Sequence, residues 1–329
     1  MSSLLEFSNS LADIVEQAGS AVVAVNAGTG ISSSGIHWRN GIIVTSDESL
    51  PRDEEITVTL SDGRSVAATH LGHDSSTDVA VFQLQDVETP VAKIGDGTTL
   101  KVGHLVLGIA RSNEGDLRAA LGTVSVVSGA WRSMSGGNID QYIRPDITLY
   151  PGFAGGPLVD AAGYVVGMNT SGRRGTALTI PAATINRVVD QLIARGHIAR
   201  GYLGVGMQPV RLPNNLITSL NLTAATGVIV VNVEPEGPAD NAGLLLGDVL
   251  VKFDGVSVSD TGDVMALLNS SDRVGKTVSV QLVRGGVLVE LAIAIGERPF
   301  EESPGSESTE KRDDYRHHRR GRHGRRGSR

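Results

Sequence analysis

The stretch Leu149–Asp160, LYPGFAGGPLVD, has the glycines and the proline of a loop that presents a catalytic nucleophile, but an alanine lies at its centre. A nucleophile must offer a lone pair to an electrophilic carbon. The methyl group of Ala154 has none, so the loop cannot attack a substrate through residue 154. The sequence therefore describes either an enzyme that has lost its nucleophile or a loop with another purpose.

Bulk composition limits the chemistry and the fold of the chain that carries this loop. Its 329 residues are 40% hydrophobic and 20% charged, which is typical of a soluble globular protein with room for two domains. The 41 glycines and only 4% aromatic residues favour turn-rich β structure. Because no cysteine is present, disulfides, thiol catalysis and cysteine metal sites are excluded.

Charge is distributed unevenly along the chain. Residues 300–329 hold 9 Lys/Arg and 6 Asp/Glu, whereas the residues before them hold 20 and 30. The acidic body argues against nucleic-acid binding by the folded part. The tail contains little to bury, so we expect it to be disordered. Its Arg/His-rich end either keeps the protein in solution or binds an anionic partner.

The N-terminal segment has no basic residue ahead of its apolar ones and carries Glu6, Asp13 and Glu16 among them. That pattern does not predict a signal peptide. No apolar run is long enough to span a bilayer, so no membrane span is expected. The location predicted from these absences is cytoplasmic.

Short strands should position the loop. In EITVTL the apolar Ile56, Val58 and Leu60 alternate with threonines, which predicts a half-buried strand. Similar runs follow one another from about residue 20 to 175. Strands at this spacing predict a closed β-barrel or a pair of barrels.

A helix and a second unit follow the strands. The helix is expected over about 183–194, with Gly196 as its C-cap. The second unit, about 201–296, mixes strands with two short helices, in PADNAGL and GDVMALLNS.

Four stretches together resemble the HtrA/Deg-type serine proteases, in which a chymotrypsin-like double β-barrel precedes a PDZ domain. They are GIIVTSDESL, STDVAVFQL, YPGFAGGPLVDAAGYVVGMNTSG and TIPAATINRVVDQLIARGHIARGYLGV. The resemblance implies a mostly β chain with three parts. These are a trypsin-like domain over 1–198, a PDZ domain over 199–298 and a disordered basic tail over 299–329.

The resemblance also assigns the three positions of a catalytic triad. The family's histidine lies in a pattern like T-x-x-H, where this chain has Glu48, and its serine lies in G-x-S-G-G, where this chain has Ala154. Only the aspartate, in T-D-x-A-V, is retained, as Asp78. A glutamate is a poor substitute for the histidine, because its reference pKa lies roughly two units lower. The family's oxyanion hole maps to the backbone N–H groups of Gly152 and Ala154, which no side-chain change removes.

Two interpretations of these positions remain open. The first is a pseudoprotease that has lost both Ser and His and acts as a peptide-binding or scaffold protein. The alternative is an active serine endopeptidase of protein quality control, with Ala154 engineered or a non-standard mechanism in use. A metal site of Glu48 and Asp78 with Asp47 or His73 is disfavoured, so neither a metal nor another cofactor is expected.

The PDZ part should hold peptides with free, apolar C-termini. GYLGV resembles the family's carboxylate-binding loop, which implies peptide contacts from Tyr202, Leu203, Gly204 and Val205. Val264 and Leu268 lie on the expected helix beside this groove. They line an apolar pocket or belong to the core of the domain, and the sequence does not decide between these roles.

The family also implies a homotrimer formed through the barrels and the N-terminal segment. Leu4 and Phe7 are the apolar residues of that segment which could serve it.

Overall fold

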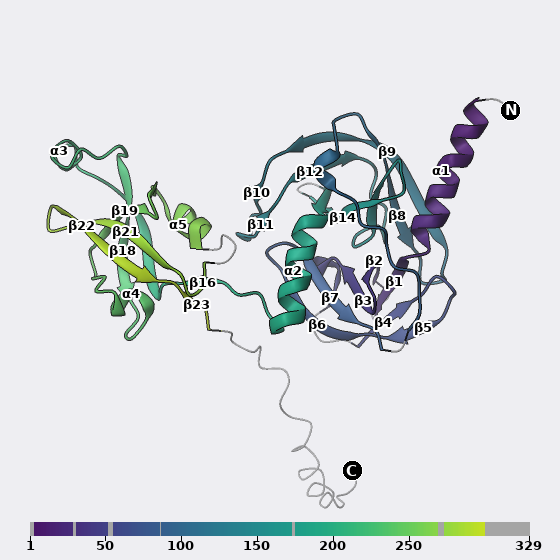
Figure 1. The fold of residues 1–329 in the computed structure, drawn as a ribbon, viewed down its shortest axis with the longest axis horizontal. Helices are drawn as coiled ribbons and strands as arrows, with labels where there is room; N and C mark the ends of the chain where they lie inside the picture. Colours follow the sequence, from purple (N-terminus) through teal and green to yellow (C-terminus); the bar gives the residue numbers. More distant parts are fainter. Residues whose placement is uncertain are drawn as a thin grey trace, which may run out of the picture. The chain divides into compact units, whose positions relative to one another are not determined.

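The computed structural model describes most of the chain between residues 3 and 299 (Figure 1). The segments left out within these bounds are 29–30, 52–54, 86, 173–174 and 269–272. The described residues up to Arg298 belong to one compact unit. The tail for which disorder was predicted therefore lies outside the described residues, apart from Pro299.

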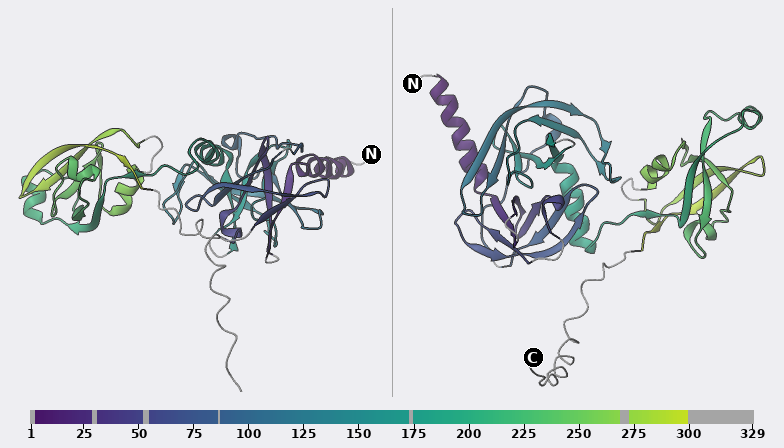
Figure 2. Two further views of the ribbon diagram at one scale, coloured as in Figure 1. Left: turned by 90° about the horizontal axis from the view of Figure 1, so that it is seen from below. Right: turned by 180° about the vertical axis from the view of Figure 1, so that it is seen from behind.

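The chain opens with a helix, α1 (Ser3–Gly19), to which the sequence analysis assigned no element. Leu11, Ile14 and Val15 recur at the spacing of one helix face and pack against the core. The earlier apolar side chains of Leu4 and Phe7 are exposed. Figure 2 shows these first turns extending beyond the strands.

Arg111 fixes the C-terminal end of α1 to the rest of the fold. Its buried guanidinium donates to the carbonyl oxygens of Gly19 at 2.7 Å, Val22 at 2.6 Å and Gly115 at 2.6 Å. Gly19 ends the helix, so this bond satisfies a carbonyl that has no partner within it. Burial lowers the pKa of Arg111.

The first sheet has seven antiparallel strands in the order β5-β4-β1-β2-β3-β7-β6. Ile56 and Val58 of β4 are buried and Thr57 between them is exposed, as the alternating pattern predicts, but Thr59 is buried as well. The strands are β1 (Val22–Ala27), β2 (Ile31–Arg39), β3 (Ile42–Thr45), β4 (Ile56–Thr59), β5 (Ser65–Ala67), β6 (Thr69–Asp74) and β7 (Val79–Gln83).

The second sheet closes into a six-stranded barrel in the order β12-β15-β14-β13-β8-β9. The predicted mostly β architecture is thereby confirmed. The barrel strands are β8 (Leu105–Arg111), β9 (Leu117–Ser128), β12 (Tyr142–Asp146), β13 (Pro157–Asp160), β14 (Val165–Ser171) and β15 (Ala177–Pro181). A small hairpin of β10 (Trp131–Arg132) and β11 (Asn138–Ile139) lies between β9 and β12 in the sequence, and a short 3₁₀ turn, η2 (Gly97–Thr99), precedes β8.

Helix α2 (Ala182–Arg195) joins the two sheets through one core. Its apolar face buries Ile185, Val188, Val189 and Leu192. Gly196 has φ +74° and its N–H bonds to Leu192 O, so the predicted helix and its C-cap are both confirmed.

The last part of the chain builds a separate sheet in the order β17-β18-β19-β21-β22, so β17 is an edge strand. Its elements are β16 (Gly201–Tyr202), β17 (Val205–Arg211), α3 (Asn214–Ser219), β18 (Thr226–Val233), α4 (Pro238–Asn241), β19 (Val249–Phe253), β20 (Val256–Ser257), α5 (Thr261–Leu268), β21 (Thr277–Arg284), β22 (Val287–Ala294) and β23 (Gly296–Glu297). Helices α4 and α5 are the two that the sequence predicts, and α3 is additional.

We expect Leu192→Ala to lower the free energy of unfolding of the barrels by about 3 kcal/mol, because the truncation leaves a cavity in the core. The matched control is Ile193→Ala, whose side chain is 51% exposed on the same helix and should cost below about 1 kcal/mol. Urea denaturation followed by circular dichroism measures both. Equal losses would contradict the assignment of α2 as the element that joins the sheets.

Candidate functional site

The loop between β12 and β13 contains a tight turn at its centre. The N–H of Phe153 donates to Tyr150 O at 3.0 Å, which encloses Pro151 and Gly152. Gly152 has φ +91°. Proline followed by a residue of positive φ is the sequence that a type II turn requires. The loop is therefore shaped by Pro151 and Gly152, whatever side chain follows.

Ser34 of β2 holds this turn from the other sheet. Its hydroxyl donates to Gly152 O at 2.6 Å, and its N–H donates to Ala154 O at 2.9 Å. On the far side, the N–H of Gly155 donates to Asn169 O at 2.9 Å. A Cβ on Gly155 would lie 2.1 Å from Ser34 O, so only glycine allows so close an approach.

Two backbone N–H groups of the loop take no part in these hydrogen bonds. The N–H groups of Gly152 and Ala154 bond to no acceptor among the residues that the structure describes. Both residues are half-buried. Backbone donors rarely stay unpaired, and a pair of them in a fixed loop is what an oxyanion hole requires. The assignment of Gly152 and Ala154 to such a hole stays a prediction.

Asp78 lies immediately before β7 and is 9% exposed. One carboxylate oxygen, Oδ1, accepts from the N–H of Glu48 at 2.7 Å. The other, Oδ2, accepts from Ser46 Oγ at 2.7 Å and from Thr170 Oγ1. Burial raises the pKa of Asp78, although these three hydrogen bonds act in the opposite direction. Sequence reasoning missed Ser46 and Thr170, because nothing local marks a serine or threonine as the partner of a distant carboxylate.

Glu48 lies on a short 3₁₀ turn, η1 (Asp47–Ser49), that follows β3. Its side chain is exposed. Partial loss of contact with water raises the pKa of Glu48, and the nearby charges of Asp78 and Asp47 add to the rise. The position therefore carries a carboxyl group beside the carboxyl groups of Asp78 and Asp47, whereas a catalytic triad needs an imidazole that donates to the aspartate.

Other residues do not replace the missing imidazole. His70 and His73 lie on β6, where their rings stack 5.4 Å apart, and neither has a hydrogen bond to Asp78 within the described part of the chain. No group of three or more His, Cys, Asp or Glu side chains among the described residues is arranged to hold a metal ion.

The predicted carboxylate loop lies between β16 and β17. The carbonyl of Leu203 accepts from Ala239 N at 2.9 Å, and that of Gly204 accepts from Glu234 N at 2.8 Å. The N–H groups of Leu203 and Gly204 have no acceptor among the described residues. Gly204 has φ +73°, a conformation that glycine adopts without strain. Val205 then begins the edge strand β17.

The remaining residues predicted to bind peptide have other partners. Tyr202 donates its hydroxyl to the Glu234 carboxylate, a bond that raises the pKa of Tyr202. Val264 and Leu268 of α5 are 0% and 3% exposed and belong to the core of this sheet. Met207 on β17 is only partly buried against the same core, and the sequence analysis missed it. A pocket role for Val264 and Leu268 stays a prediction.

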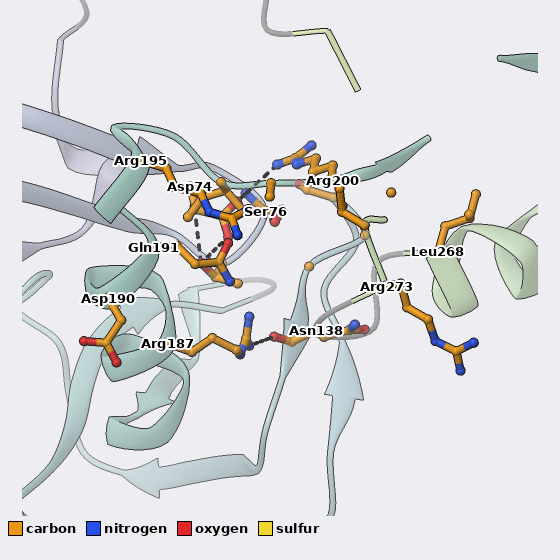
Figure 3. Close-up of a pocket in the computed structure, with 18 of the residues that line it drawn as sticks. Asp74, Ser76, Asn138, Arg187, Asp190, Gln191, Arg195, Arg200, Leu268 and Arg273 are labelled. Carbon is orange, nitrogen blue, oxygen red and sulfur yellow. Dashed lines mark hydrogen bonds and ion pairs between the residues drawn. The ribbon is translucent and has the colours of Figure 1, made fainter. Parts of the chain in front are cut away.

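A polar cavity of about 450 Å³ lies elsewhere, beside α2 (Figure 3). In it Arg200 Nη2 pairs with Asp74 Oδ1 at 3.1 Å, and Arg187 Nη2 donates to Asn138 O at 2.6 Å. Neither Asp78 nor Ala154 lines this cavity, although Thr77, the neighbour of Asp78 in the sequence, does.

Two family models match the chain. A trypsin-like peptidase domain covers residues 28–168 and a PDZ domain covers residues 201–295. These ranges fall within the predicted domains, whose outer boundaries stay predictions.

Curated relatives and solved structures agree with these matches. The "Probable periplasmic serine endoprotease DegP-like" of Pseudomonas savastanoi pv. phaseolicola is 34% identical over 80% of this chain and 55% of the relative. The protein of the same name from Chlamydia pneumoniae is 32% identical over 80% of this chain and 54% of the relative. The chain thus spans about half the length of these relatives. The structure "HtrA-type protease AlgW with tripeptide" is 30% identical, with a TM-score of 0.68 over 88% of this chain and 98% of that one.

The predicted cytoplasmic location is contradicted by these names, which place the relatives in the periplasm. The prediction was wrong because it was drawn only from the lack of a recognisable export signal. Such a lack does not show in which compartment a protein works. No helix of the described residues is both long enough and apolar enough to cross a membrane.

We expect Glu48→Gln to raise the melting temperature of the barrels at pH 7 by about 1–2 °C, because it removes repulsion between Glu48 and the neighbouring carboxylates. Exposed charge pairs change the free energy of unfolding by about 0.2–1 kcal/mol. A carboxyl whose pKa is raised by folding binds protons more tightly in the folded chain. Its contribution to stability therefore declines as the pH rises from its unfolded pKa, about 4, through its folded pKa. At pH 4 the substitution should have little effect.

Differential scanning calorimetry at both pH values measures this dependence. The control is Glu16→Gln, which changes an exposed carboxyl on α1. A drop at pH 7, or an equal rise at both pH values, would show that Glu48 is not repelled by its neighbours.

Proposed function

Because this chain belongs to the HtrA/Deg-type family of trypsin-like serine proteases with a PDZ domain, we propose that it is a pseudoprotease that binds peptides without cleaving them. The observation that carries the proposal is the pair Glu48 and Ala154 at two of the three triad positions. Its main activity is then to bind peptides or proteins with free, apolar C-termini through the PDZ domain.

The chemistry of the triad positions supports the loss of cleavage. Serine hydrolysis needs a nucleophilic oxygen and a base that takes its proton and returns it to the leaving group. Ala154 supplies no oxygen, and removing that serine alone costs on the order of 10⁶ in turnover. The Asp78 carboxylate already accepts three hydrogen bonds, none of them from an imidazole.

The backbone of the barrel loop supports continued binding of a peptide. Peptide carbonyl oxygens are acceptors, and the N–H groups of Gly152 and Ala154 have no acceptor among the described residues. A similar solved structure is entitled "HtrA-type protease AlgW with tripeptide", which names a peptide as the ligand of that protein. We infer that the barrel loop can bind a chain segment that stays intact.

The PDZ domain supports the choice of a C-terminus as the ligand. A carboxylate is bound by consecutive backbone donors, and those of Leu203 and Gly204 lack acceptors within the described residues. The edge of β17 can pair with the residues that precede the carboxylate. Val205 and Met207 are partly buried apolar side chains on that strand, which suits an apolar terminal residue.

Self-association is part of the same proposal. Leu4 is 73% and Phe7 is 45% exposed on α1, and apolar side chains gathered on one exposed segment favour burial against another surface. We infer a homotrimer in which the first turns of α1 are covered. The basic tail is proposed to bind an anionic partner.

Ala154→Ser alone should leave hydrolysis of fluorescent casein at the wild-type level. The new hydroxyl lacks a general base, because the ionised carboxyl of Glu48 is too weakly basic to take its proton at pH 7. The assay is run beside an active relative such as the HtrA-type protease AlgW. Turnover by this single variant within about tenfold of the active relative would contradict the role given to Glu48 and favour an engineered alanine.

The full-length chain should bind a fluorescent peptide with a free, apolar C-terminus at micromolar Kd, about −8 kcal/mol. Amidating the peptide should weaken binding at least about tenfold, because charge-assisted hydrogen bonds to the carboxylate are lost. Fluorescence polarisation measures both affinities. Equal affinity for the acid and the amide would mean that the loop around Gly204 is not the site.

Gly204→Val should abolish this binding through crowding of the loop. The matched control is Gly243→Val, because Gly243 has a similar φ, +79°, but faces open space. Both variants therefore carry similar backbone strain, and only Gly204→Val alters the carboxylate loop. Similar losses in the two variants would attribute the effect to strain.

A further inference from the structure

The Asp78 carboxylate accepts hydrogen bonds from two other segments of the protein. Ser46 follows β3, Glu48 lies on η1, and Thr170 comes from β14 of the second barrel. Asp78 itself adopts φ +59°, which a short acidic side chain tolerates better than most. A residue held by so many bonds at the junction of two sheets has a structural task that does not require catalysis.

The lone pairs of this carboxylate are unevenly used. An ionised carboxylate offers about four acceptor positions, two on each oxygen. Oδ1 receives one donor, the N–H of Glu48, whereas Oδ2 receives both the Ser46 and the Thr170 hydroxyls. Oδ2 therefore has no position left for a further donor.

In a working triad the imidazole donates its Nδ1–H to the aspartate, which fixes the tautomer that leaves Nε2 free to act as the base. We propose that the Ser46 hydroxyl competes with any imidazole at position 48 for the Asp78 carboxylate, because together with Thr170 it fills Oδ2 and leaves only one position on Oδ1, the oxygen that already accepts from the N–H of residue 48. This inference rests on the proposed function and deepens it. Ser46 acts through Asp78 and is a positioning residue.

The burial of Ser46 makes it unfavourable to displace its hydroxyl from the Asp78 carboxylate. Ser46 is 1% exposed, and its oxygen is held by Asp78 alone among the described acceptors. An imidazole that displaced it would leave a buried hydroxyl without an acceptor. After restoration of histidine and serine at positions 48 and 154, the imidazole would therefore share Asp78 with the Ser46 hydroxyl, and the His–Asp pair would be weaker than without it.

The test compares Glu48→His with Glu48→His/Ser46→Ala in the full-length chain. The imidazole introduced at position 48 is titrated by NMR, with its signals identified by difference from the wild-type spectrum. Removing the Ser46 hydroxyl should raise the pKa of that imidazole by about one unit, because a donor bonded to a carboxylate holds its proton more tightly. The readout needs no enzymatic activity.

Ser49→Ala in the same Glu48→His background is the matched control. Ser49 lies on the same turn, and its hydroxyl donates to the backbone carbonyl of Ser46 at 2.7 Å rather than to Asp78. This substitution should leave the titration unchanged. If Ser46→Ala unfolds the chain, as the spectrum would reveal, Ser46→Cys fills the same volume with a weaker donor.

An imidazole pKa that is the same with and without the Ser46 hydroxyl overturns the inference. So does an equal rise in the Ser49→Ala control. Neither result touches the proposed function, which is decided by turnover of the wild-type chain. Conversely, proteolysis by the wild-type chain would refute the pseudoprotease and leave the titration readable.

Discussion

The site depends on the hydrogen bonds of one fully buried residue, Ser34. From β2 of the first sheet it donates to Gly152 O and Ala154 O, the two carbonyls that fix the loop of the second barrel. Its own oxygens accept from Thr45 Oγ1 at 2.7 Å and from the N–H of Arg111 at 3.0 Å. None of these bonds involves the side chain of residue 154. The shape of the loop therefore does not depend on whether that residue is a serine or an alanine.

The groups that bind a peptide are therefore different from the side chains that would cleave it. Bond cleavage needs particular side chains at three positions, and at two of the positions that we propose for them this chain has Glu48 and Ala154. Binding needs backbone donors, and those of the barrel loop and the PDZ loop are set by turns and glycines. The retained Asp78 fits the same division, because its carboxylate connects Ser46, Glu48 and Thr170 rather than an imidazole. The proposed pseudoprotease would therefore keep its fold and its groups for binding peptides without the side chains for cleavage.

Local patterns predicted the parts of this protein that local physics determines. The alternation at Ile56 and Val58 and the capped helix α2 follow from side-chain periodicity, and both are confirmed. The partners of the site could not be found in this way. Ser34 and Gly152 lie 118 residues apart, and Asp78 and Thr170 lie 92 apart, so only the packed fold brings them together. Leu268 is buried in the core of its sheet, which periodicity alone did not show, and its role in a peptide pocket stays a prediction.

The most direct test of the account is active-site labelling of the wild-type chain with a fluorophosphonate probe, followed by intact-mass spectrometry. The probe reacts with a serine only where a base activates its hydroxyl. The account predicts no adduct after incubation that labels an active HtrA-type protease to completion. A single stoichiometric adduct on any serine would contradict it, because it would reveal a nucleophile that Ala154 and Glu48 do not account for.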